Sequence, residues 1–172
     1  MNYLARLEHT DNVHMKDPEG IWFGDPCYVV PDTLWDRWCE LSSSYDKQNP
    51  DLPRCYVAEC RSERDTFYTW STAYGDGCYG LFVNNEQVAK LGVDAGTLSA
   101  IPMSLIRRWH DGSPDNPWVT GHVDQLGHVI EDKHVGGEIV MDQGDLMWGA
   151  VSLPTGGVDD EEYDPDEEEL VW

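Results

Sequence analysis

The acidic C-terminal end is the feature that most limits what this chain can fold into. The last Lys or Arg is Lys133, and residues 159–169 hold nine carboxylates in eleven positions. Fully extended, such a stretch carries about one negative charge per 4 Å, close to the line charge of one nucleic-acid strand. A stretch so charged stays solvated. We therefore expect a globular domain over residues 1–157 and a disordered acidic tail over residues 158–172.

The rest of the chain is acidic as well. The formal net charge is −22 over 172 residues, and subtracting the nine tail charges leaves −13 for residues 1–158. Hydrophobic residues make up 40%, with eight Trp and eight Tyr, which is typical of a chain with a packed core. The length favours one domain. This charge points to basic proteins as partners and argues against direct binding of DNA or RNA.

Cysteine content and hydropathy indicate the compartment. Five cysteines, an odd number, are typical of a reducing environment. Cys55 and Cys60 would face opposite sides of one strand, where they are poorly placed to pair. There is no apolar N-terminal segment and no apolar run near 18 residues, so we expect a cytoplasmic protein that does not enter a membrane.

Short apolar runs separated by Gly, Pro and Asx turns predict an antiparallel, β-rich α+β fold. One main helix is expected over about residues 32–43, since Leu34, Trp38 and Leu41 recur at helical spacing after Pro31. Residues 44–54 resemble a loop, and residues 104–109 add a helical turn. Strands are expected at residues 3–8, 21–23, 27–30, 55–61, 66–72, 78–83, 87–93, 97–101, 118–123, 128–130, 138–141 and 146–153. The strands at 55–61 and 66–72 are expected to form a hairpin, and those at 78–83 and 87–93 flank the turn signal Asn84-Asn85.

Two short patterns occur more than once. Gly24-Asp25-Pro26-Cys27-Tyr28 is echoed by Gly75-Asp76-Gly77-Cys78-Tyr79, and Asp94-Ala95-Gly96-Thr97-Leu98 by Asp142-Gln143-Gly144-Asp145-Leu146. Each copy places an Asx or Gly turn before an apolar run, which is turn chemistry. The segments Ile21–Val30, Thr72–Tyr79 and Gly92–Thr97 resemble small bacteriophage and prophage proteins of unknown function over about residues 20–102, whereas the Asp142–Leu146 copy lies outside this resemblance. The resemblance implies a phage origin and a compact β-rich domain, and transfers no functional residue.

The tail and the acids closest to it form the candidate partner-binding set. Carboxylates presented in series could occupy a basic groove that normally holds nucleic acid, and Trp172 could add an apolar anchor. The alternative is a solvated tail that keeps the protein soluble. The candidate residues are Asp159, Asp160, Glu161, Glu162, Asp164, Asp166, Glu167, Glu168, Glu169 and Trp172 in the tail, with Glu138, Asp142 and Asp145 extending the same negative face.

Two other sets of residues could carry chemistry. His122, His128 and His134 recur every six residues, which puts them on one face of an extended chain, where imidazoles could bind a transition metal. Exposed strand histidines are the alternative. Asp25 and Asp76 each lie two residues before a cysteine and could do acid–base work if brought together. A nearby carboxylate raises a thiol pKa, so neither cysteine is expected to be a nucleophile, and turn-capping Asp residues are the simpler interpretation.

The hypothesis that accounts for most of these features is a non-enzymatic, phage-encoded acidic inhibitor without a cofactor. It would act in the host cytoplasm on a basic, nucleic-acid-binding protein such as a defence nuclease, restriction enzyme or polymerase. A small metal- or carboxylate-dependent enzyme acting on a nucleotide-like metabolite is the second hypothesis. A virion-associated structural protein is the third. The sequence makes no prediction of oligomeric state.

Overall fold

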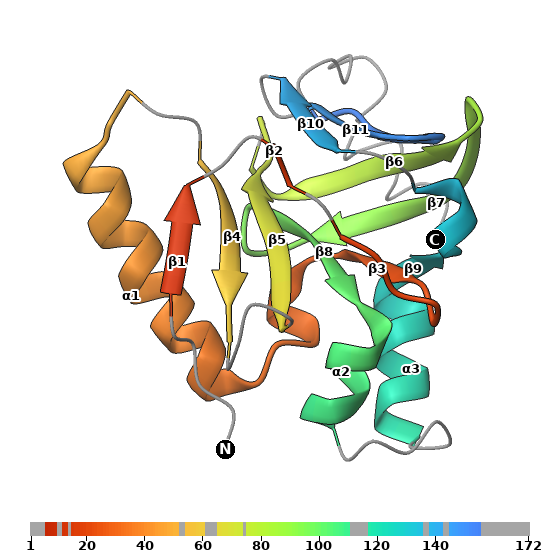
Figure 1. Cartoon of the computed structure of the whole chain (residues 1–172), viewed down its shortest axis with the longest axis horizontal. Coiled ribbons are helices and arrows are strands. Elements are labelled where there is room, and N and C mark those ends of the chain that lie inside the picture. Colours follow the sequence, from red (N-terminus) through yellow and green to blue (C-terminus); the bar gives the residue numbers. More distant parts are fainter. Residues whose placement is uncertain are drawn as a thin grey trace, which may run out of the picture.

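Two antiparallel sheets of six strands each, here sheets A and B, form the centre of the molecule (Figure 1). The computed structural model describes residues 6–9, 12–13, 15–51, 54–60, 65–73, 75–110, 117–135, 138–142 and 145–155. Sheet A has the order β1 (Arg6–His9), β4 (Cys55–Glu59), β5 (Thr66–Ser71), β8 (Thr97–Pro102), β3 (Ile21–Gly24) and β9 (Gly127–Ile130). Sheet B has the order β2 (Asn12–Val13), β10 (Ile139–Asp142), β11 (Asp145–Trp148), β12 (Val151–Leu153), β6 (Gly77–Val83) and β7 (Glu86–Val93). The predicted β-rich α+β fold is confirmed.

The first hydrophobic core lies between the two sheets. Phe23 of sheet A and Trp148 of sheet B meet there with ring centroids 6.2 Å apart. Other buried members are Ile21, Cys55, Tyr68, Trp70, Leu98 and Ala100 from sheet A, and Tyr79, Leu81, Leu91, Val93, Ile139, Leu146, Val151 and Leu153 from sheet B. Because inward and outward side chains alternate along a strand, the opposite face of each sheet must be covered separately or left to solvent.

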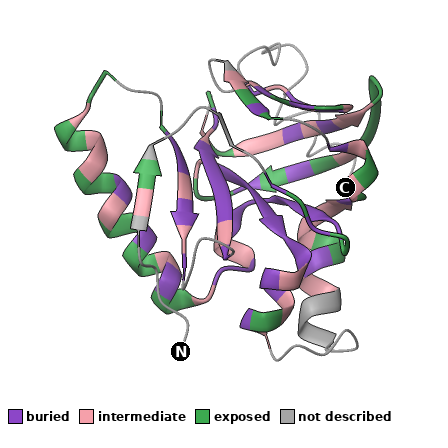
Figure 2. Ribbon diagram, in the orientation of Figure 1, coloured by how far each residue is buried: buried purple, intermediate pink, exposed green. Residues whose placement is uncertain are grey.

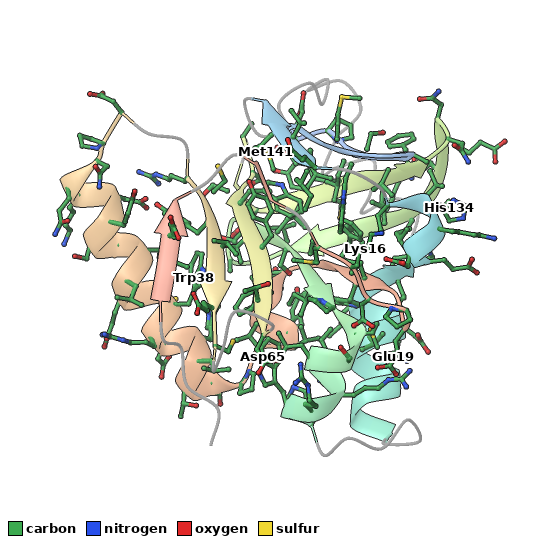
Figure 3. All side chains as sticks on the ribbon, viewed as in Figure 1. Lys16, Glu19, Trp38, Asp65, His134 and Met141 are labelled. Atoms are coloured by element: carbon green, nitrogen blue, oxygen red, sulfur yellow. The ribbon has the colours of Figure 1, made fainter. Side chains whose placement is uncertain are left out.

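A second core covers the other face of sheet A. The helices α1 (Asp32–Gln48), α2 (Met103–Trp109) and α3 (Pro117–Leu126) contribute to it. Trp38 of α1 lies over this face (Figure 3), and its indole nitrogen donates a hydrogen bond of 3.2 Å to the Thr69 hydroxyl. Cys60 belongs to this core and Cys55 to the first, so their predicted placement on opposite sides is confirmed. Sheet A is thus covered on both faces, and β8 is buried along its whole length (Figure 2).

Trp22 joins the middle of sheet A to α3. Its indole nitrogen donates a 3.0 Å hydrogen bond to the Val123 carbonyl oxygen. The ring lies over Gly24 and Gly127, which are cross-strand partners, and a Cβ at Gly127 would come within 2.3 Å of it. Only glycine leaves room for the indole at these two positions, and the Gly24 of the repeated pattern therefore has a packing role.

The main helix is longer than the sequence predicts. The expected helix over about residues 32–43 begins as predicted, but α1 continues to Gln48 through residues expected to form a loop. Tyr45 lies one turn beyond Leu41 and packs edge-on against Tyr56 of β4, with ring centroids 5.5 Å apart. This tertiary contact outweighs the weak helix propensity of the Ser-rich segment.

Three predicted strands are wrong. Residues 27–30 begin instead in the 3₁₀ helix η1 (Pro26–Tyr28), since the Asp25 side chain caps it by accepting a 2.9 Å bond from the Cys27 amide. Residues 118–123 lie in α3, which starts at Pro117, a residue well suited to the first helical position. Residues 146–153 form two strands rather than one, because Gly149 adopts φ +60° and reverses the chain between β11 and β12.

The two predicted hairpins are confirmed. Strands β4 and β5 pair over residues 55–70 with Val57 opposite Tyr68. Strands β6 and β7 pair across Asn84 and Asn85, whose φ values of 51° and 67° are those of a type I′ turn. The short helix at residues 104–109 is also confirmed as α2, which starts one residue earlier at Met103.

Candidate functional site

Asp25 is the centre of a junction formed by the repeated sequence patterns. Its carboxylate is fully buried. One oxygen accepts the bond from Cys27 that caps η1, and the other accepts bonds from the backbone amides of Asp94 at 2.7 Å and Ala95 at 2.8 Å. A single buried side chain thus fastens the turn between β7 and β8 to the start of η1.

Residues 72–79, which contain the second copy of the Gly-Asp pattern, join the same junction. The Thr72 amide donates a 3.1 Å bond to the Gly96 carbonyl, and the Thr72 hydroxyl donates a 2.6 Å bond to that of Gly75. Tyr79 also donates to the Gly75 carbonyl, at 2.8 Å. The three segments that carry the phage resemblance, far apart in the sequence, therefore meet at one place. In all three segments the contacts are hydrogen bonds that connect one turn to another.

The thiol at this junction is held in its neutral form. Burial, a hydrogen bond to Asp25 and the negative charges of Asp25, Asp94 and Asp76 raise the pKa of Cys27 to about 12. A thiol with this pKa is protonated at neutral pH and is a poor nucleophile. The Asp25 carboxylate, in turn, is committed to three backbone donors. The structure agrees with the turn-capping interpretation of Asp25, and Asp76 is exposed beside it.

The three histidines do not lie on one extended face, and that prediction is wrong. His122 lies on α3, His128 on β9 and His134 in the 3₁₀ helix η2 (Asp132–His134), because residues 117–126 are helical and break the extended spacing. Among the residues that the structure describes, no group of three or more His, Cys, Asp or Glu side chains could hold a metal ion.

His110 was missed by sequence reasoning. It follows α2, and its Nε2 lies 2.6 Å from the Val29 carbonyl oxygen. Burial lowers the pKa of His110, the bond to Val29 opposes that shift, and the charge of His122 adds to the lowering. No sequence spacing links His110 with Val29 or His122, since the contact depends on how α2 and α3 pack.

The last described residue, Thr155, lies beside the acidic hairpin that β10 and β11 form. Asp142 and Asp145 are cross-strand partners at the end of this hairpin. Asp145 accepts a 2.7 Å bond from the amide of buried Thr155, whose hydroxyl accepts a 3.1 Å bond from the Ala73 amide. The final described residue is thus fixed beside Asp145.

The remaining predicted partner-binding residues divide into two groups. Glu138 is exposed directly before β10. The tail residues Asp159, Asp160, Glu161, Glu162, Asp164, Asp166, Glu167, Glu168, Glu169 and Trp172 lie outside the described residues. The structure therefore brings Asp142 and Asp145 together at one end of β10 and places Glu138 at the other end of the same strand.

Five of the eleven Lys and Arg residues form recorded ion pairs elsewhere on the protein. Arg107 pairs with Glu19 and Arg108 with Asp65, near α2 (Figure 3). The other recorded pairs are Arg37–Glu40, Arg54–Asp46 and Lys133–Glu131. Strands β10, β11, β12 and β6 contain no Lys or Arg. These four strands of sheet B therefore contribute only acidic or neutral side chains.

An exposed apolar set lies on the same sheet. Within the described ranges, the exposed large hydrophobic side chains are Val88, Val140 and Met147, with exposed fractions of 41%, 54% and 61%. They belong to β7, β10 and β11 of sheet B. Sequence reasoning missed them because residues 138–141 and 146–153 are apolar without a regular alternation that would mark an outer face.

The chain matches no protein-family model, no curated protein and no solved structure. In the part of the chain that the structure describes, no helix combines the length and the apolar character needed to cross a lipid bilayer. The chemistry of the surface itself therefore carries the functional argument.

Proposed function

We propose that this protein is a phage-encoded, non-enzymatic acidic inhibitor that binds a basic, nucleic-acid-handling protein in the host cytoplasm. The observation that supports the proposal is the bond from the amide of Thr155, the last described residue, to the Asp145 carboxylate of the acidic hairpin. The nine tail carboxylates begin four residues further along the chain, and we infer that they act together with the hairpin acids on a partner. The phage origin rests on the resemblance of residues 20–102.

The mechanism is competition for a phosphate-binding groove. A carboxylate series with nearly the line charge of a nucleic-acid strand replaces phosphates and releases the counterions that surround a basic groove. Long-range attraction speeds the encounter, and the exposed charges make the affinity depend on salt. The mechanism needs no catalytic group, which agrees with the neutral thiol of Cys27 and the engaged carboxylate of Asp25.

Removal of residues 159–172 tests the proposal. We expect the full chain, immobilised and exposed to host lysate at roughly 0.1 M salt, to retain proteins that double-stranded DNA then displaces. Truncation should reduce this retention by at least about tenfold and flatten its salt dependence. A variant with Asp51→Asn, an exposed acid far from the tail in sequence, is the control and should bind normally.

Two outcomes count against the proposal. Equal retention by the full and truncated chains, with the same dependence on salt, would show that the tail has no binding role. Retained proteins that DNA does not displace, or enrichment of the protein in purified virus particles, would favour the hypothesis of a virion-associated protein.

A further inference from the structure

The outer face of sheet B carries an uncharged row that crosses five strands. Val140 lies opposite Met147, Met147 opposite Ser152, and Ser152 opposite Phe82, and the row ends at Gln87 of β7. Four strand spacings make it roughly 19 Å wide. We call Val140, Met147, Ser152 and Phe82 the outer row. Val140 and Met147 are its exposed apolar members, whereas Phe82 and Ser152 are half-buried, and adjacent exposed apolar side chains typically mark an interaction site.

The inward neighbours confirm the direction in which the row faces. Ile139, Leu146 and Leu153 are fully buried in the core between the sheets, so the residues alternating with them point away from it. The Phe82 ring lies over Gly80, where a Cβ would come within 2.9 Å of the ring. The aromatic side chain is therefore held flat on the outer surface, and the row has a fixed shape.

No helix that the structure describes covers this face. All three pack with sheet A, whereas β10 and β11 lie on the opposite side of the molecule (Figure 1). Figure 2 shows exposed residues on these two strands beside buried ones. The corresponding face of sheet A is covered by large aromatic side chains. The outer face of sheet A is thus covered by helices, whereas no described helix covers the outer row on sheet B.

Carboxylates flank the row along the strands. Glu138 lies two residues before Val140, and Asp145 lies two residues before Met147, so each occupies the same face as its apolar neighbour. Asp142 pairs with Asp145 at the hairpin. Lys90, the one Lys or Arg in the described strands of sheet B, lies opposite Gly80 and therefore shares the outer face with Phe82 at the far end of the row. An apolar centre with a charged border is the usual composition of a protein interface.

We propose that the outer row is the docking surface for a basic protein that presents apolar side chains between its cations. This inference rests on the proposed function and adds the part of the contact that salt does not screen. The negative charge around the outer row determines which kind of molecule can bind there. A second copy would bring together two acidic borders on chains of net charge −22, and the protein's own tail would bring nine acids back to the acidic hairpin.

Two synthetic peptides test the proposal on the full chain. One alternates Lys and Leu, the other alternates Lys and Ser at the same length and charge. We expect the Lys–Leu peptide to bind at least about tenfold more tightly, and the double variant Val140→Ser, Met147→Ser to lose most of that difference while its binding of the Lys–Ser peptide is unchanged. Cys39→Ser, an exposed position on α1, is the control variant and should behave as the original chain.

The outcomes separate this inference from the proposed function. Equal affinity for both peptides, or a Lys–Leu preference that survives the double variant, overturns the docking surface and leaves the acidic function standing. Failure to bind either peptide at both low and high salt overturns the proposed function itself. Since both substituted side chains are exposed, we expect the urea midpoint of the double variant to match the original, which excludes unfolding as the cause.

Two further measurements address the other occupants. Sedimentation equilibrium should show a monomer that is unchanged by the double variant; a dimer abolished by it would assign the row to a second copy. Peroxide oxidation of Met147 should proceed at the same rate with and without residues 159–172. Faster oxidation after truncation would assign the row to the tail.

Discussion

Asp25 shows how one buried residue can hold several turns in place. Its carboxylate accepts bonds from three backbone amides, and it is fully excluded from solvent. We expect Asp25→Asn to destabilise the protein by about 2–3 kcal/mol, because the amide NH2 that replaces one carboxylate oxygen cannot accept from the buried N–H groups that face it. Urea unfolding followed by tryptophan fluorescence measures this loss.

Asp76 provides the matched control for that substitution. It occupies the equivalent position of the second sequence copy but is exposed. Asp76→Asn should change the free energy of unfolding by less than about 0.5 kcal/mol. If both substitutions had the same small effect, Asp25 would have no special structural role.

The capping role of Asp25 was predictable, but its distant partners were not. An Asp before Pro-Cys bonds its own backbone two residues on, and this is a local preference that the sequence displays. The bonds to Asp94 and Ala95 cross about 70 residues and depend on how β3 and β8 pair. For the same reason His110 could not be linked with Val29.

The turn between β6 and β7 is the element that the sequence specifies most clearly. Asn84 and Asn85 both have positive φ, which asparagine tolerates better than other non-glycine residues. We expect Asn85→Ala to lower the free energy of unfolding by about 1 kcal/mol, since alanine is strained in this conformation, and Asn85→Gly to be neutral or slightly stabilising. The midpoint of urea unfolding measures both effects.

A neighbouring position controls for the loss of any exposed side chain. Glu86 follows the turn and is exposed, and Glu86→Ala should change stability by less than about 0.5 kcal/mol. Equal effects of alanine and glycine at position 85 would mean that its φ value does not limit the hairpin.

Elements defined by turn residues and helical spacing were mostly predicted correctly, apart from η1 and the reversal at Gly149, whereas those defined by tertiary contacts were not. Both hairpins and the start of α1 follow from turn residues and helical spacing. Residues 118–123 have a composition favourable to strands, yet they form part of α3, which packs on Trp22 through Val123. The outer row was missed because only strand pairing shows that Val140 and Met147 are neighbours on an exposed face.

At the scale of the whole molecule, two electrostatic effects oppose each other as salt is added. Screening weakens the exposed ion pairs, such as Arg37–Glu40 and Lys133–Glu131, but each of these contributes at most about 1 kcal/mol. Screening also weakens the mutual repulsion of a chain with net charge −22, which acts over the whole surface. The second effect involves many more charge pairs, so we expect added salt to stabilise the folded protein overall.

We therefore expect the melting temperature to rise by a few degrees between roughly 0.02 and 0.3 M sodium chloride. Truncation of residues 159–172 should reduce this rise, since it removes nine of the charges. Differential scanning calorimetry measures both, and sodium chloride is preferred because sulfate would stabilise the fold by a separate effect on apolar burial. A melting temperature that falls with salt would mean that the ion pairs outweigh the repulsion. A rise of equal size in the truncated chain would place the destabilising charge in the folded domain, and the tail would then affect binding without affecting stability.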